Sequence, residues 1–245
     1  MGLFTKKINL VDLLNGFNDI HNHLLPGIDD GAQNIEEAIQ LVKMYKDIGI
    51  TNFYATPHTM SDSYPNTKKT ILNALNTLQS ALEKEGIAQN FTITAASEYM
   101  LDYEFEELLK KDDLLTLKDN HVLIEMSYLH AFDRFNEVVY DLQLKGYQPI
   151  LAHPERYLYY IDDKTIFTQI KNRGVKLQLN ALSLSDYYGS KIKDKALKLL
   201  KEGMYDFIGL DTHKTKHLVF LEKVKIAKKY QPMIEQLIAN NKTLV

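Results

Sequence analysis

The sequence predicts an α/β fold in which parallel strands form a barrel surrounded by helices. Short apolar runs alternate with segments of helical periodicity along all 245 residues. A strand, a helix and a further strand in succession build a parallel sheet that is covered on both faces. No linker or low-complexity stretch divides the chain, and its length suits a single barrel domain. The closed barrel is inferred from the number of strands, and an open sheet is the alternative.

Seven strands are expected, and polar residues follow most of them. The runs span residues 17–21, 52–56, 91–96, 121–126, 149–153, 175–180 and 206–211. The clearest helix starts near Asn34, which forms a capping pair with Glu37, and it ends before Gly49. Further helices are expected at 66–86, 132–146, 164–174, 191–203 and in the region after 216.

Residues 1–17 are expected to form an N-terminal extension that packs on the barrel, and residues 18–245 the catalytic domain. Within the extension, residues 3–14 have the pattern of a short amphipathic helix. We expect it to plug the bottom of the barrel or to act as a lid. Contact with a membrane or a partner is the alternative.

Composition excludes several classes of protein. With a net charge of −3 and a pI near 6.2, the chain has no overall attraction for nucleic acid or anionic lipid. It has no cysteine, which excludes disulfides and thiolate metal sites. The start lacks the apolar stretch of a signal peptide, and no run approaches the roughly 20 apolar residues of a membrane span. These features predict a cytoplasmic protein without stable membrane insertion.

Histidines gather at the ends of the expected strands. In a parallel barrel all these ends open on one rim, where active sites of this architecture lie. Side chains two residues apart in a strand point the same way. His21 and His23 therefore present their groups side by side, as do Asp211 and His213. The pattern predicts an enzyme with a polynuclear metal site, whose residues at strand ends are His21, His23, His58, His153, Asp211 and His213.

Two glutamates and one arginine extend this prediction. Glu98 and Glu125 lie in apolar runs, where a carboxylate is costly unless it is paired or metal-bound; for Glu125 a buried ion pair is the alternative. Arg156 is the expected phosphate clamp, because a guanidinium binds two phosphate oxygens at once. A salt bridge with Glu155 is its alternative role. Asp29-Asp30-Gly31 lies in the loop after the first strand, and its alternative role is to cap the helix that begins near Asn34.

The remaining aromatic and histidine residues receive simpler interpretations. Tyrosines and a phenylalanine in rim loops can form a wall around a phenyl ring, although core packing is the ordinary role of each one: Tyr64, Tyr99, Tyr128 and Phe132. His121 begins a strand and should face the opposite rim. His130 and His217 are expected to be surface residues.

These residues, taken in order, resemble the polymerase-and-histidinol-phosphatase (PHP) superfamily. The resemblance rests on Asp19-Ile20-His21-Asn22-His23, Asp29-Asp30-Gly31, Thr56-Pro57-His58, Ala96-Ser97-Glu98, Leu123-Ile124-Glu125, Ala152-His153-Pro154-Glu155-Arg156 and Asp211-Thr212-His213. More narrowly, the chain is similar to bacterial manganese-dependent protein-tyrosine phosphatases that act beside capsule and exopolysaccharide tyrosine kinases. The resemblance implies that residues 18–245 are a PHP metallophosphatase domain with a distorted (β/α)7 barrel.

It also implies up to three Mn²⁺ ions. One ion is expected at His21, His23, Glu98 and Asp211, a second at Glu98, Glu125 and His153, and a third at Asp30, His58 and His213. The donor chemistry alone is compatible with Mn²⁺, Fe²⁺ or Zn²⁺ and disfavours copper(I). The chain departs from the family pattern after Asp211-Thr212-His213, where an arginine is expected and Lys214, Lys216 or His217 can replace it.

The predicted reaction is hydrolysis of a phosphotyrosine protein, the tail of a bacterial tyrosine autokinase, by a metal-activated water without a covalent intermediate. Glu98, His58 and Arg156 are the expected catalytic residues, with His58 as a proton donor if it is not committed to metal. A histidinol-phosphate phosphatase is the first alternative. A nuclease is disfavoured by the absence of a basic stripe. A non-catalytic phosphotyrosine-binding module has no need of three metals.

Overall fold

A computed structural model describes residues 6–160, 163 and 165–244 of the protein. Strands occupy all seven expected places: β2 (Asn18–Asp19), β3 (Asn52–Ala55), β5 (Thr92–Ala95), β7 (His121–Glu125), β8 (Gln148–Ala152), β9 (Lys176–Asn180) and β10 (Phe207–Gly209). Two further strands, β4 (His58–Thr59) and β6 (Glu98–Met100), continue β3 and β5 after an interruption of two residues. Neighbouring strands pair in parallel in the orders β2-β3-β5 and β4-β6-β7-β8-β9-β10.

The barrel closes between its first and last strands. Asn22 and Thr212 form a parallel bridge, in which the His23 amide donates to the Thr212 carbonyl at 2.9 Å. The Asp211 amide donates to the carbonyl of His21 at 2.7 Å. The predicted distorted (β/α)7 barrel is therefore confirmed, and the open sheet is excluded. The distortion lies at β3 and β5, which break before the rim.

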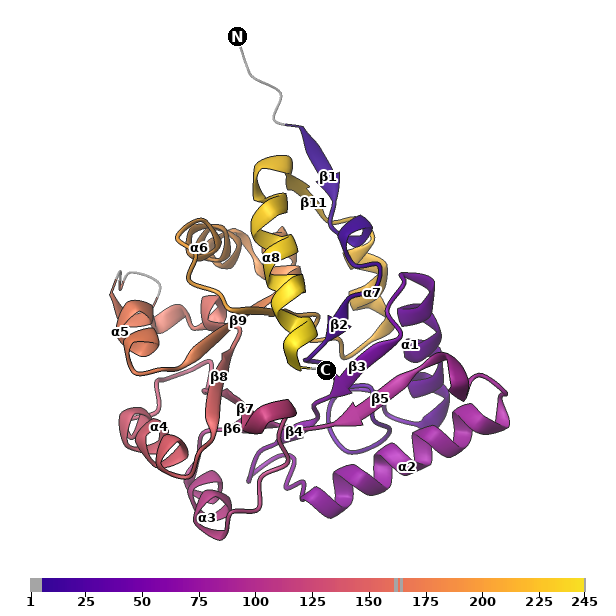
Figure 1. Ribbon diagram of the computed structural model, residues 1–245, viewed down its shortest axis with the longest axis horizontal. Helices are drawn as coiled ribbons and strands as arrows, with labels where there is room; N and C mark the ends of the chain where they lie inside the picture. Colours follow the sequence, from indigo (N-terminus) through magenta and orange to yellow (C-terminus); the bar gives the residue numbers. More distant parts are fainter. Residues whose placement is uncertain (1–5, 161–162, 164, 245) are drawn as a thin grey trace.

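Helices surround the strands (Figure 1). They are α1 (Ile35–Asp47), α2 (Lys68–Lys84), α3 (Tyr103–Lys111), α4 (Phe135–Leu144), α5 (Ile166–Asn172), α6 (Ser190–Lys201), α7 (Thr215–Leu221) and α8 (Gln231–Asn241). Asn34 caps α1 as predicted, since its side chain accepts from the Glu37 amide at 2.9 Å. The helix α3 was not expected. Of the described helices, none is long and apolar enough to span a bilayer.

The predicted helix at residues 3–14 is wrong in its described part. Lys7–Asn9 form strand β1, which pairs antiparallel with β11 (Lys225–Ala227), and a single 3-10 turn follows at Val11–Leu13. A partner strand supplies hydrogen bonds along this segment that a short helix would have to form alone. Residues 3–5 lie outside the described residues. The division into 1–17 and 18–245 stays a prediction.

The apolar core has two parts. The larger cluster includes helix and strand residues between the barrel and its surrounding helices. The smaller cluster takes residues from most barrel strands: Ile20, Tyr54, Ala96, Leu117, Leu123, Ile150, Ala152, Phe207 and Leu244. Leu123 and Glu125 are two apart on β7 and so face the same side. The small cluster therefore fills the barrel interior and forms a floor under the polar rim.

Candidate metal centre

All nine expected metal ligands lie close together at the C-terminal ends of the strands. Eight of them form three overlapping groups in which the ligand atoms lie within 4.8 Å of one another. The groups are His21, His23, Glu98 and Asp211; His23, Asp30, His58 and His213; and His58, Glu98 and Glu125. His153 stands beside the third group. Residues up to 192 positions apart in the sequence, His21 and His213, thus share one site.

The first group is the one that the sequence predicts, and it is fully buried. The Nε2 atom of His21 lies 3.1 Å from Glu98 Oε2 and 3.4 Å from Asp211 Oδ1. The Nε2 atom of His23 lies 3.4 Å from each of the same two oxygens. Two imidazoles and two carboxylates therefore direct their ligand atoms at a common point.

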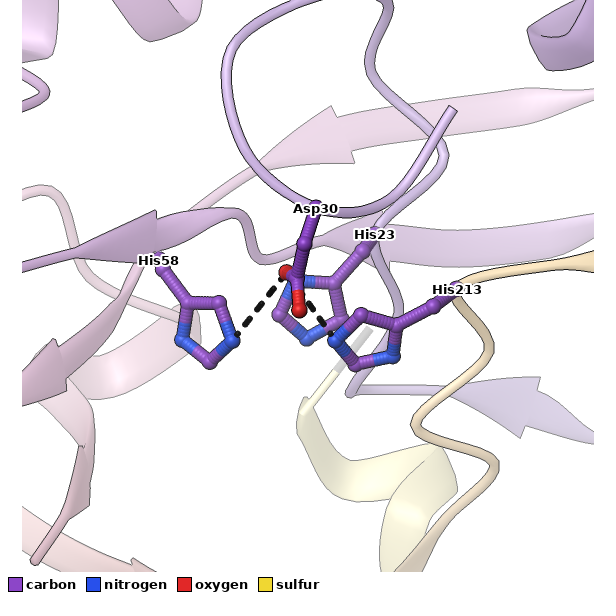
Figure 2. Close-up of side chains that lie close together, drawn as sticks. All are labelled: His23, Asp30, His58 and His213. Carbon is purple, nitrogen blue, oxygen red and sulfur yellow. Dashed lines mark ion pairs between the residues drawn. The ribbon is translucent and has the colours of Figure 1, made fainter. Parts of the chain in front are cut away.

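The second group contains the predicted Asp30, His58 and His213, and it also includes His23 (Figure 2). The Oδ1 atom of Asp30 lies 3.6 Å from His58 Nε2 and 3.4 Å from His213 Nε2. Asp30 lies in the loop after β2, and its side chain is half-exposed. His58 is the first residue of β4. The rings of His23 and His213 stack with centroids 3.8 Å apart.

The third group differs from the prediction in one member. The Nδ1 atom of His58 lies 3.1 Å from Glu98 Oε2 and 2.9 Å from Glu125 Oε1. The expected His153 lies 3.0 Å from Glu98 Oε1 but 4.0 Å from Glu125 Oε2. His58 therefore lies in two groups, and each of its ring nitrogens faces one of them.

Several of these atoms lack ordinary hydrogen bonds, which tests whether the residues fit metal ions. Glu98 Oε2, Glu125 Oε1, His58 Nδ1 and His153 Nδ1 are buried and have no hydrogen-bond partner among the described residues. Buried carboxylate oxygens without donors are costly unless a cation compensates them. The donor set of imidazole and carboxylate without sulfur suits divalent transition metals. The residues fit the expected metal ions.

The same crowding shifts pKa values in the metal-free protein. Burial alone would raise the pKa of Glu98, yet His21 and His58 hold it well below its usual range. Burial likewise opposes ionisation of Asp211, but His21 and His213 keep its pKa well below normal. Burial lowers the pKa of His58, and the charges of Glu125 and Glu98 outweigh it and raise the pKa to about 9. Without metal, protons on the imidazoles take the place of cations.

Sequence reasoning did not find the residues that orient the ligands. Gln178 Oε1 lies 3.0 Å from His21 Nδ1, which leaves Nε2 free to face the centre. Asp29 Oδ2 lies 2.8 Å from His23 Nδ1 and accepts from the His58 amide at 3.1 Å. Such partners fix the ring orientation of metal-binding histidines. The alternative role of Asp29-Asp30-Gly31 as the cap of α1 is wrong, because Asn34 fills that position.

Backbone strain and tight packing also mark the site. His153 and Asp211 have φ angles of 35° and 50°, in the left-handed region that non-glycine residues rarely adopt. This conformation turns each side chain away from its strand and toward the rim. A Cβ on Gly31 would lie 2.0 Å from the His23 carbonyl, and one on Gly209 would lie 2.7 Å from His21 Cβ. Only glycine fits at these two positions.

Arg156 lies at the edge of the centre. Its Nη1 donates to Asp211 Oδ2 at 2.7 Å, and its guanidinium lies 4.6 Å from the ring centre of Tyr128 and 4.3 Å from that of Tyr188. The alternative salt bridge with Glu155 is wrong. Glu155 is buried elsewhere, where it accepts hydrogen bonds from the Asn180 amide and the Tyr205 hydroxyl.

The centre opens into a cavity of about 450 Å³, the main cavity. Its wall contains Met60, Tyr64, Met100, Tyr128 and Leu129, with Arg156 and metal-centre residues at its base. Tyr64 and Tyr128 thus form part of the expected aromatic wall. Tyr99 and Phe132 belong to the packed core instead, and the Tyr99 hydroxyl accepts from the Leu115 amide.

The other histidines follow the predictions except for His217. His130 is exposed, and His121 begins β7 at the end opposite to the site. His217 lies at the rim, where its Nδ1 accepts from the His213 amide at 3.2 Å. Burial and the neighbouring His213 lower the pKa of His217 to about 4.

Comparisons with known proteins show a family and several relatives that the chain resembles. Residues 17–243 match the family described as capsular polysaccharide synthesis, CpsB/CapC. The tyrosine-protein phosphatase YwqE of Bacillus subtilis is 32% identical over 81% of this chain and 78% of its own. A putative tyrosine-protein phosphatase CapC of Staphylococcus aureus is 29% identical over 93% and 90%.

A solved structure supports the fold as well. It comes from work on YwqE from Bacillus subtilis and CpsB from Streptococcus pneumoniae, described as unique metal-dependent tyrosine phosphatases. It superposes on this chain with a TM-score of 0.80 at 28% identity, over 93% of both chains. With the family match across residues 17–243 and a barrel of the same architecture, the chain belongs to the CpsB/CapC family of capsular polysaccharide synthesis.

Proposed function

We propose that this protein is a metal-dependent protein-tyrosine phosphatase that uses Mn²⁺. One observation carries the proposal: three overlapping groups of histidines and carboxylates meet at the barrel rim beside Arg156. Relatives that match most of the chain are named tyrosine-protein phosphatases. A phosphate monoester is the substrate class that such a centre suits, because cations and a guanidinium together neutralise phosphate oxygens.

The ligands are assigned from the geometry. His21, His23, Glu98 and Asp211 would hold one ion, and Asp30, His58 and His213, with His23 nearby, a second. Glu98, Glu125, His58 and His153 supply the donors for a third. When bound, such ions lower the pKa of water toward ~7 and neutralise developing charge on the phosphate. His58 faces two of these groups, so we assign it to metal binding and not to proton transfer.

The chain's own residues orient the substrate. Arg156 is held between two tyrosine rings and anchored on Asp211, so its planar group is fixed before substrate arrives. Its remaining N–H groups can donate to phosphate oxygens. The apolar and aromatic wall of the main cavity, which includes Met60, Tyr64 and Leu129, suits a phenyl ring.

The leaving group fits a site without a dedicated acid. A tyrosine phenolate has a conjugate acid with a pKa of ~10 and leaves more easily than an alkoxide. The chain has no cysteine, so a thiolate nucleophile is excluded. We infer direct attack of water on phosphorus, with departure of the phenolate and no covalent intermediate. The physiological substrate we propose is the tail of a bacterial tyrosine autokinase, encountered in the cytoplasm.

A reconstitution assay tests this function. Purified protein is stripped with a chelator, reloaded separately with Mn²⁺, Fe²⁺ or Zn²⁺, and assayed on a phosphotyrosine peptide. We expect turnover only after metal is added, with Mn²⁺ the most effective. Glu98→Gln should lower both bound metal and turnover by at least about a hundredfold, because Glu98 serves two groups. Glu107→Gln, an exposed carboxylate, is the matched control and should change neither.

Two outcomes would reject the proposal. Activity that survives complete removal of metal would exclude the metal-dependent reaction. A preference of more than about tenfold for histidinol phosphate over the phosphotyrosine peptide, about 1.4 kcal/mol, would favour the related histidinol-phosphate phosphatase instead.

A further inference from the structure

A second cavity adjoins the main cavity at the rim. This side pocket has a volume of about 410 Å³ and is bordered by Tyr187, Tyr188, Lys214, Lys216 and His217. It shares Asp30, Arg156, Asp211 and His213 with the main cavity. Arg156 therefore stands between two connected spaces. A peptide whose phosphotyrosine occupies the main cavity can place a neighbouring residue over the side pocket, because the two cavities adjoin.

Among the described residues that border the side pocket, one cationic side chain has no hydrogen bond or ion pair. Lys214 is engaged, since its Nζ donates to the Gly31 carbonyl at 2.6 Å. His217 is held through Nδ1 by the His213 amide. Lys216 is exposed, and its ammonium has no hydrogen bond or ion pair within the described part of the chain. The acidic groups of the pocket are occupied: Asp211 by Arg156 and His21, and Asp30 by His58 and His213.

We propose that the side pocket is a specificity subsite for an anionic group on the substrate, next to the phosphotyrosine, and that Lys216 is its recognising cation. The inference rests on the proposed function and names the substrate class more closely. The anion is the carboxylate of an Asp or Glu, or the phosphate of a second phosphotyrosine. Tyr187 and Tyr188 border the pocket and offer ring surface to a second aromatic side chain.

Geometry sets the sequence position of this group. An extended peptide advances about 3.3–3.6 Å per residue, and side chains two residues apart face the same side. The two cavities share four residues, so they are direct neighbours. The anionic side chain therefore lies within about two residues of the phosphotyrosine. An ammonium at the edge of a groove is partly screened by solvent, so we expect a preference of about threefold to tenfold.

The test uses peptides that differ only beside the phosphotyrosine: alanine, aspartate or a second phosphotyrosine at the two preceding or at the two following positions. The measured quantity is the ratio of kcat/KM for each anionic peptide to that of the alanine peptide, with Mn²⁺-loaded full-length protein. A second readout is the Kd of the same peptides with a non-hydrolysable phosphonate in place of the first phosphate. The variants are Lys216→Glu, Lys216→Arg and, as a control with the same charge change, the exposed Lys201→Glu at the end of α6.

We expect a ratio of about three to ten in the wild type, a ratio near or below one in Lys216→Glu, and recovery in Lys216→Arg. Lys201→Glu should keep the wild-type ratio. The aspartate and phosphotyrosine peptides show which anion is preferred. A wild-type ratio near one for both anions, or a Lys216→Glu variant that weakens all peptides equally, would overturn the inference. If no peptide is hydrolysed but the Kd preference depends on Lys216, the proposed function fails and the subsite stands.

Discussion

The metal centre depends on side chains that do not touch the ions. Gln178 contacts His21, and Asp29 contacts His23. Each contact is made to Nδ1, the ring nitrogen that faces away from the centre. Asp29 has two further bonds, from the amides of His58 and Gly31. A single carboxylate thus positions His23, the start of β4 and the loop that carries Asp30. Loss of its charge should disturb both metal groups that contain His23.

Asp29→Asn tests this role. The amide keeps the size of the side chain, but it has one acceptor oxygen where the carboxylate has two. His23 is therefore held less firmly. We expect metal affinity and kcat to fall by about tenfold to a hundredfold, while the fold is retained. Metal titration followed by calorimetry, together with a phosphotyrosine assay, measures both. Asp62→Asn on an exposed loop is the control, and an Asp29 variant with unchanged metal affinity would contradict the assignment.

His58 gives the metal-free protein a characteristic dependence on pH. Burial lowers the pKa of His58 in the folded state, but the charges of Glu125 and Glu98 outweigh burial and raise the pKa from 6.5 to about 9. Protonated His58 therefore stabilises the fold fully below pH 6.5, and this contribution is lost as the pH rises through 9. We expect the Tm of the metal-free protein to fall over this range.

Bound Mn²⁺ should reduce that fall, because a cation replaces the protons. Thermal unfolding from about pH 6 to 10, with and without metal, measures the effect. The variant His58→Asn should have a smaller slope, with a remainder from His21 and His23, whose pKa values are also raised by neighbouring carboxylates. Exposed His130→Asn should keep the full slope. An unchanged slope in His58→Asn would show that another group is responsible.

At the scale of elements, the breaks in β3 and β5 and the loop after β2 bring the ligands to the rim. Thr56-Pro57 and Ala96-Ser97 interrupt the two strands, and each strand resumes at a ligand, His58 or Glu98. The loop that carries Asp30 lies directly on His23, with its Ala32 amide donating to the His23 carbonyl at 3.1 Å. Gly31 permits this close approach.

Gly31→Ala should therefore displace the loop. A methyl group there would lie 2.0 Å from a backbone oxygen, so the loop must move and carry Asp30 away from His58 and His213. We expect loss of one metal ion per chain and a large loss of turnover, measured by metal analysis and assay. Gly86→Ala is the control: its φ of +69° makes alanine unfavourable by about 1 kcal/mol, but no atom lies near and the metal content should not change.

At the scale of the whole molecule, the barrel is closed by few backbone bonds between β2 and β10, and side chains reinforce the seam. Asp19 Oδ1 accepts from the Leu210 amide at 3.0 Å. Asn241, at the end of α8, donates to the carbonyls of Asn18 and Ile208 and accepts from the Ile208 amide. The last helix thus joins the first and last strands beneath the metal centre.

Asn241→Ala should weaken this seam. It leaves three backbone groups of the barrel without their partner, and each buried unsatisfied group costs about 1–3 kcal/mol. We expect the free energy of unfolding to fall by at least about 2 kcal/mol in chemical denaturation. Gln236→Ala, on an exposed face of the same helix, is the control. Equal stability of the two variants would show that the seam does not need Asn241.

Local pattern was sufficient for the strand positions and most helices, because burial on both faces makes strands apolar. It also singled out the histidines and carboxylates at the strand ends, whereas Asp30 was expected only from the family resemblance. It failed at residues 3–14, where the partner strand β11 lies more than 200 residues away. It also missed α3 and the roles of Asp29 and Gln178. Gln178 carries no local signal, since its function depends on a histidine 157 residues away. Asp29 lies only six residues after His23, but its contact depends on how the loop between them folds back.

The order of residues alone was enough to identify a parallel barrel with a ring of imidazoles and carboxylates, because periodicity and strand ends are short-range properties. Three-dimensional packing was needed to show which ligands share a point, that His58 replaces His153 in the tightest contact with Glu125, and that Arg156 pairs with Asp211. It was also needed to separate Lys214, which donates to the Gly31 carbonyl, from Lys216, which has no partner among residues 6–160, 163 and 165–244. Distances between side chains depend on how strands twist and loops fold back, and no spacing along the chain contains that information.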